Sequence, residues 1–261
     1  MQIRNLHAAL LLALSSALLP IGAAHAANIM TIDYYTIAET DKDANHLATG
    51  VYSNEVQSNL GADGLPVLNT AAYGCLSNCY NPVGAPTDVL ANGEITYWSP
   101  SLNNGGAGGT SDVTHTGTAS VTLPFNVPSN FFPPNGTGSS DSNGFQAAVL
   151  SGTLTNAVTT QISFSIGADD MAFAYLDGVV VCDLGGVHAD TPGTCVTPFD
   201  ITAGTHQLQV FFVDINNVQS GFSFDITTRD VVTTGTVPEP ATLALVGVAL
   251  GGLALRRRRA S

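Results

Sequence analysis

Basic residues are scarce in this sequence. Lys and Arg together number 7 of 261 residues, against 20 Asp and Glu. Five of the seven, Arg4 and the four arginines at 256–259, lie in the two terminal segments, which leaves Lys42 and Arg229 in the body. Between residues 27 and 236 there are therefore 19 acids against 2 bases, a net charge near −17. Such a surface excludes nucleic acid and anionic lipid as favourable partners and attracts cations.

The common local signatures of enzymes are also missing. The sequence contains no Gly-x-Ser-x-Gly elbow, no His-Glu-x-x-His pair and no phosphate-binding Walker loop. A glycosidase needs two separated carboxylates, whereas the most prominent pair here, Asp169 and Asp170, is adjacent. We therefore predict a protein that is not an enzyme, and a secreted hydrolase remains the alternative.

Long helical patterns are absent from residues 27–230, a length that suits one domain. Apolar residues alternate with polar or small ones in several short segments, which predicts strands. Asp177-Gly178 lies between two apolar runs and predicts a hairpin, because Gly accepts the positive φ of a type I′ turn. The sequence thus predicts an all-β fold, either two packed antiparallel sheets in a β-sandwich or a closed barrel.

The first 26 residues have the three parts of a signal peptide. Arg4 supplies a positive charge, residues 6–19 are largely apolar, and Ala24-His25-Ala26 fits the small-x-small cleavage pattern. We expect a signal helix at residues 1–26 and a mature chain that begins near Ala27.

The last 25 residues form a second targeting segment, which follows a short linker at 231–236. Pro238-Glu239-Pro240 precedes an apolar run at 241–255, and Arg256, Arg257, Arg258 and Arg259 follow it. We expect an apolar helix here that spans the membrane with its arginines on the cytoplasmic side. Residues 237–261 resemble the PEP-CTERM sorting signal. The resemblance implies an exosortase as partner, with Glu239 and its two prolines as the recognition element.

Four cysteines in an exported chain favour disulfides, and three connectivities are possible. The closest pairs in sequence are Cys75 with Cys79 and Cys182 with Cys195, and we favour them because each closes a local loop. A zinc site at Cys75 and Cys79 is not favoured, since no second Cys or His pair lies nearby.

Adjacent carboxylates at Asp169 and Asp170 end one predicted strand and begin the next. Neighbouring side chains on a strand point to opposite faces, so both reach one ion only if the backbone bends, for instance at a cis peptide. Calcium suits such a pair because it takes six to eight oxygens in flexible geometry. The alternative is a solvated turn that happens to hold two aspartates.

A family resemblance favours the calcium interpretation. The Asp pair, the Asp177-Gly178 hairpin and Asp183-Leu-Gly-Gly-Val-His188 resemble the fibro-slime domain, a relative of the calcium-dependent, sugar-binding β-domain of the protective-antigen type. The similarity spans residues 32–228 and is strongest after Gly167. Further matching segments are Leu60–Leu68, Trp98, Phe131–Pro133, Gly204 and Ser220–Phe224.

The resemblance also implies the remaining site residues. A late-loop Asn joins the Asp pair at calcium in such sugar binders, so Asp214, Asn216 and Asn217 are expected to complete the metal site. Ala168 departs from the family pattern, which has an Asp there. His188 either contacts the ligand or is structural, with its neutral ring donating to a backbone carbonyl.

Asp41-x-Asp43-x-Asn45 begins like an EF-hand loop but then departs from it. The sixth position is His46 instead of Gly, and the twelfth is Tyr52 instead of Glu. We therefore interpret Asp41 and Asp43 as part of a solvated acidic turn.

Together these features predict an exported protein of the cell surface or extracellular matrix of a Gram-negative-type bacterium, held transiently in the inner membrane. A calcium-assisted carbohydrate-binding or adhesive module, with polysaccharide or surface glycan as partner, is one hypothesis. A structural matrix protein without a specific ligand is the second, and a secreted glycoside hydrolase or other hydrolase is the third.

Processing at both ends can be tested by mass. The signal peptide should be removed before Ala27, and the tail should be cut or held near Pro238–Pro240. Intact-mass measurement of the surface-exposed protein should therefore show neither Met1 nor a free chain end at Ser261. An unprocessed full-length mass would contradict both assignments.

Overall fold

The computed structural model describes the body of the chain with several gaps. The described residues are 28–41, 43, 50–69, 88–104, 110–128, 131, 144–191, 195, 198–216, 219–228 and 232–234. The signal and sorting segments, Cys75, Cys79 and Asn217 lie outside them. Within these ranges, no helix is long and apolar enough to cross a membrane.

The described structure is all-β, and every strand pair is antiparallel, as the period-two pattern predicts. One large sheet runs in the order β2 (Val113–Thr122), β1 (Ile29–Ile37), β4 (Phe145–Asn156), β10 (Gly204–Val213), β7 (Met171–Leu176) and β8 (Val179–Leu184), with β12 (Val232–Thr234) also paired to β4. A smaller sheet has the order β3 (Phe125–Val127), β11 (Gly221–Ile226) and β6 (Phe164–Asp169). A third pair joins β5 (Thr160–Ile162) to β9 (Phe199–Ile201).

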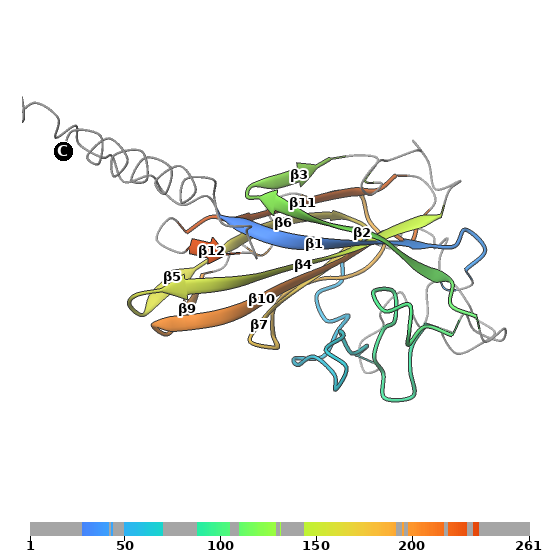
Figure 1. Ribbon diagram of the computed structural model, residues 1–261, viewed down its shortest axis with the longest axis horizontal. Coiled ribbons are helices and arrows are strands. Elements are labelled where there is room, and N and C mark those ends of the chain that lie inside the picture. Colours follow the sequence, from blue (N-terminus) through green and yellow to red (C-terminus); the bar gives the residue numbers. More distant parts are fainter. Residues whose placement is uncertain are drawn as a thin grey trace, which may run out of the picture.

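The small sheet packs on one face of the large sheet, which resolves the two alternatives in favour of a β-sandwich (Figure 1). Phe212 of β10 stacks on Phe222 of β11 with ring centroids 4.8 Å apart. Phe131 meets the edge of Phe212 at 5.0 Å and closes the same core. Burying each such ring contributes about 1.5–3 kcal/mol to the free energy of unfolding.

Segments 50–69 and 88–104 cover the opposite face of the large sheet. Figure 1 shows them gathered below the sheet, on the side away from β3 and β11. Trp98 anchors this outer layer: its indole Nε1 donates to the carbonyl of Phe212 over 2.7 Å, and its ring meets Phe211 edge-on at 5.2 Å. A second buried cluster forms between the layers. The large sheet is therefore apolar on both faces.

Strand β7 illustrates the consequence of this three-layer arrangement. Met171, Phe173 and Tyr175 face the outer layer, whereas Ala172 and Ala174 face the sandwich core. All six residues of β7 are buried. The alternation of large and small side chains in the sequence therefore reflects two buried faces that pack against different layers. It does not reflect one buried and one exposed face.

The outer layer docks along β8 because glycine allows close approach. Tyr52 and Gly185 exchange backbone hydrogen bonds of 2.8 Å in both directions. A Cβ at Gly185 would overlap the Glu55 side chain, and Gly186 has a φ of +89°. These two glycines belong to the quoted Asp183–His188 motif, so that motif has a packing role.

Two sequence interpretations need correction. Residues 231–236 were expected to be a linker, but β12 lies within them and pairs with β4 at Thr153–Thr155, just beyond the part of β4 that β1 covers. Asp41 and Asp43 were expected to be solvated, but they are only 5% and 3% exposed. The predicted Asp177-Gly178 turn is confirmed, with φ values of 51° and 76°.

Cys182 and Cys195 form a disulfide, the pair favoured by its short loop. Their Cα atoms are 5.6 Å apart, and they lie 13 positions apart in the sequence. Cys182 lies in the sandwich core, so the bond fastens the segment after β8 to that core.

Removal of this disulfide should destabilise the domain. Closing a loop of this length contributes roughly 3 kcal/mol in the chain-entropy model. Cys195→Ser should therefore lower the urea midpoint without changing the fold, as judged by far-UV circular dichroism. Non-reducing peptide mapping of the wild-type protein supplies the control, and a different partner for Cys182 would refute the assignment.

Candidate metal and ligand site

The chain changes from one sheet to the other at two neighbouring places. Asp169 ends β6 in the small sheet, and Met171 begins β7 in the large one. The segment 214–220 makes the reverse crossing, from β10 to β11. The register places the two crossings side by side, because Asp169 pairs with Gly221 and Met171 pairs with Val213.

Three carboxylates meet at these crossings. One ligand oxygen from each of Asp169, Asp170 and Asp214 lies within 4.8 Å of the other two. Asp170 is 1% exposed, Asp214 is fully buried and Asp169 is partly buried. The Asp169–Asp170 peptide bond is cis, the geometry anticipated for a pair that shares one ion. The structure therefore brings together three of the five predicted metal ligands, and Asn216 lies in the same crossing.

Backbone groups hold the acidic side chains in place. The amide of Ile215 donates to Asp170 Oδ2 over 2.8 Å, and the amide of Asn216 donates to Asp214 Oδ1 over 3.2 Å. The amide of Asp214 itself donates to the carbonyl of Gln146 over 2.8 Å and so extends the large sheet. The late loop is thus fixed both to the sheet and to the Asp pair.

A buried oxygen of Asp170 has no donor among the described residues. Asp170 Oδ1 is inaccessible to solvent and accepts no hydrogen bond from the described residues. Leaving a buried carboxylate oxygen without a partner is unfavourable. A hard cation would supply the partner, and Ca²⁺ accepts several carboxylates together with amide, carbonyl and water oxygens. The residues present therefore fit calcium.

Burial raises the pKa of Asp170 to about 8, and the negative charge of Asp169 adds to the effect, while the hydrogen bond from Ile215 opposes it. In the absence of a cation, the folded protein therefore holds a proton at this site well above the usual range of a carboxyl group. Proton and cation compete for the same oxygens.

A cavity of about 200 Å³ opens beside the carboxylates. It is lined by Asp169, Asp170, Val187, His188, Ala189, Asn216 and Gln219. His188 Nδ1 lies 2.9 Å from the carbonyl oxygen of Ala189, to which a protonated Nδ1 donates. His188 Nε2 is buried and accepts no bond from the described residues. His188 thus has the backbone contact expected of a structural residue and also borders the ligand cavity.

A second, larger cleft of about 460 Å³ lies at the Asp183 end of the Asp183–His188 motif. Hydroxyl and amide side chains dominate its lining, which consists of Ser53, Asn54, Val56, Gln57, Ser58, Asn59, Asn69, Val180 and Asp183. Asp183 also accepts a 3.0 Å hydrogen bond from the amide of Val56. The first residue of the Asp183–His188 motif therefore borders one cleft and its last residue borders the other.

The sequence did not indicate every residue at the site. Ala189 and Gln219 line the cavity, and no pattern distinguishes them from other residues of their type, while Val187 lies in the Asp183–His188 motif but was not assigned to the site. The departure at Ala168 does not remove a ligand from the carboxylate group, because the Ala168 side chain is fully buried in the sandwich core. Asn217 lies outside the described residues.

The raised pKa of Asp170 predicts the direction in which the stability of the protein changes with pH. Since the folded protein holds the proton more tightly than the unfolded chain, chelator-treated protein should lose stability as the pH rises from about 4 towards 8, by up to 1.4 kcal/mol per pH unit for this group. Asp170→Asn should remove that contribution, as measured by urea unfolding at intervals across this range. An equal pH dependence in the two proteins would show that Asp170 does not titrate there.

Comparison with known proteins identifies the tail and leaves the body unassigned. Residues 236–259 match the PEP-CTERM protein-sorting motif. The motif marks an exported protein that an exosortase handles at the membrane. No curated protein matches this chain. The match covers the tail alone, so the fibro-slime resemblance of the body stays a prediction.

Several solved structures are similar to this chain at low identity. The PA14 sugar-binding domain from an RTX adhesin shares 12% identity over 80% of this chain and 96% of that domain, with a TM-score of 0.35. A subtype-switched epithelial adhesin 9 A domain from Candida glabrata, in complex with β-lactose, shares 14% over 80% and 85%, with a TM-score of 0.31. The PA14 domain of the MpAFP antifreeze protein shares 13% over 36% of this chain and 55% of that chain, with a TM-score of 0.29. This chain thus spans about half of the MpAFP domain, and the low scores assign no function.

Proposed function

We propose that the body is a calcium-assisted carbohydrate-binding module, which acts in adhesion at the cell surface or in the extracellular matrix after exosortase sorting. The observation that carries this proposal is the open cavity bordered by Asp169 and Asp170, which converge with the buried Asp214, together with a buried oxygen of Asp170 that has no donor among the described residues. A site of this kind is suited to a cation that still has positions free for an outside ligand.

Sugar hydroxyls match such a site chemically. They are hard oxygen donors, and Ca²⁺ with six to eight positions retains some after binding Asp169, Asp170 and Asp214. The side chain of Asn216, the expected amide ligand, borders the same cavity. When bound, the cation would neutralise the carboxylates and coordinate vicinal hydroxyls, while His188 Nε2 would accept a hydrogen bond from the sugar.

The wider surface also supports a neutral polymer as ligand. Hydroxyl and amide side chains line the larger cleft at the other end of the Asp183–His188 motif, and such groups pair with sugar hydroxyls without needing charge. The strongly acidic body disfavours polyanions in the absence of a bridging cation. We therefore propose an exopolysaccharide or a surface glycan with vicinal hydroxyls as the partner.

Calcium and sugar binding can be tested together on the mature body. With calcium at a hundred times its dissociation constant, the wild-type protein should gain about 2.7 kcal/mol in unfolding free energy. A glycan array should show binding in calcium and none in excess EDTA. Asp170→Asn should lose glycan binding and the part of the calcium stabilisation that comes from this site, because it removes a charge from the metal ligands, whereas the exposed Asp200→Asn on β9 should retain both.

The outcomes separate the competing functions. If calorimetry detects no calcium binding and chelator leaves melting and glycan binding unchanged, the metal site is refuted. If calcium binds but no glycan is retained, a structural matrix protein replaces the proposal. Release of reducing sugars from the native exopolysaccharide would instead identify a hydrolase.

A further inference from the structure

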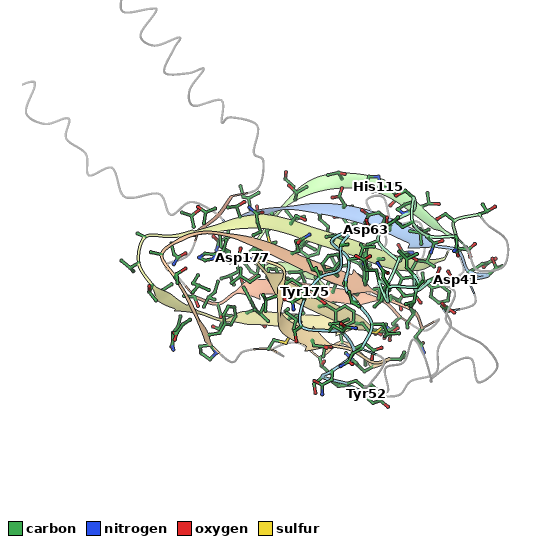
Figure 2. All side chains as sticks on the ribbon, turned by 90° about the horizontal axis from the view of Figure 1, so that it is seen from below. Asp41, Tyr52, Asp63, His115, Tyr175 and Asp177 are labelled. Atoms are coloured by element: carbon green, nitrogen blue, oxygen red, sulfur yellow. A yellow bond between two sulfur atoms is a disulfide. The ribbon has the colours of Figure 1, made fainter. Side chains whose placement is uncertain are left out.

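A second group of buried acids lies elsewhere in the body, with no assigned role. Asp41, Asp43 and Asp88 are 5%, 3% and 1% exposed. Asp41 follows the end of β1, and Asp88 begins the outer-layer segment 88–104. Figure 2 shows Asp41 towards one end of the sandwich and Asp177 towards the other. The acids therefore lie near the end of β1, at the place where the outer layer covers it.

Protein donors satisfy only part of this group. The amide of Asp43 donates to Asp41 Oδ1, and the amide of Asp88 donates to Asp43 Oδ2, each over 2.7 Å. The side-chain amide of Asn103 donates to Asp88 Oδ1. Asp41 Oδ2 and Asp88 Oδ2 are buried, and neither accepts a hydrogen bond from a described donor. The Asp41 and Asp88 carboxyl groups are close neighbours, since each shifts the pKa of the other.

The charge of the group exceeds what one proton can cancel. Burial, reinforced by Asp41 and Asp43, raises the pKa of Asp88 to about 8, so Asp88 can retain a proton. Even when Asp88 is protonated, the carboxylates of Asp41 and Asp43 remain buried beside each other, and the negative charge of Asp112 also acts on Asp41. Buried charges without compensation are strongly unfavourable.

We propose that Asp41 and Asp88 hold a second divalent cation of the calcium class, distinct from the ion at the sheet crossings. Each offers a buried carboxylate oxygen that has no donor among the described residues. Asp43 and Asp112 add negative charge around the pair, and water and carbonyl oxygens complete the coordination that a hard cation requires. A divalent ion neutralises two carboxylates at once.

The position of this site indicates its role. The cation would join Asp41, at the end of β1, to Asp88, at the start of the segment that carries Trp98. Ile37, near the second site, pairs with Phe145 of β4. Two residues further along β4, Ala147 pairs with Val213, which is next to the first site. Three strand spacings of about 4.8 Å separate β1 from β7, so the two sites occupy one end of the sheet without sharing ligands. The second ion would thus hold the outer layer against the large sheet, at the same end of the sheet as the first site.

Calorimetric titration with Ca²⁺ tests the proposal on the mature chain. The wild-type protein should bind two equivalents, and Asp170→Asn should retain one. Asp88→Asn in the wild-type background should lose the other, while Asp63→Asn, an exposed acid of the same outer layer, should change nothing. Absence of calcium binding by the folded Asp170→Asn protein would overturn the second site, as would two retained equivalents in Asp88→Asn. Loss of glycan binding alone would concern only the first site.

Hydrogen exchange gives a measurement that does not depend on folding of the Asp88 variant. In the Asp170→Asn protein, calcium should slow exchange of the Thr96 amide, which donates to the carbonyl of Asp88 over 2.8 Å, and of neighbouring amides in 88–104. Unchanged exchange in this segment on addition of calcium would show that the acids share a proton instead of a cation.

Discussion

The hydrogen bond from the Ile215 amide to Asp170 joins two neighbouring places where the chain passes between the large and the small sheet. The connection from β6 to β7 and the connection from β10 to β11 lie at the same end of the sheets, and both meet at this contact. Asp214 ties the second turn to β4 through its own amide. The geometry of the cavity therefore follows from the way the sandwich is connected.

The outer layer depends on a different constraint, the closeness of backbones. Along β8 and its extension, Gly185 and Gly186 let segment 50–56 approach to hydrogen-bonding distance, which side chains at these positions would prevent. Trp98 then fixes the layer across β10. Since the same six-residue motif ends at His188, packing of the layer and placement of a cavity residue are coupled through one short stretch of chain.

The acidic residues of the body give the protein its overall negative charge, and some of them also form two buried groups. Most of the 19 acids between residues 27 and 236 contribute to a strongly negative protein, whereas Asp170, Asp214, Asp41 and Asp88 are buried in two groups. Burial of like charges in a chain with 2 bases between these residues favours cations or protons as partners. The two groups lie at one end of the large sheet, where the outer layer and the sheet crossings meet.

The sequence by itself determined the features that depend on neighbouring residues. Alternating apolar positions predicted antiparallel strands, Asp177-Gly178 predicted the turn, and short spacing favoured Cys182–Cys195. Only the tertiary structure decided which distant side chains share a space. Asp41-x-Asp43 reads as a solvated turn, but segment 88–104 covers it and brings Asp88 against it. For Asp214 the family resemblance implied a place beside the Asp pair, but the physical reason is tertiary: β7 and β10 are neighbours, and such pairing is set by packing over the whole sheet rather than by any local pattern.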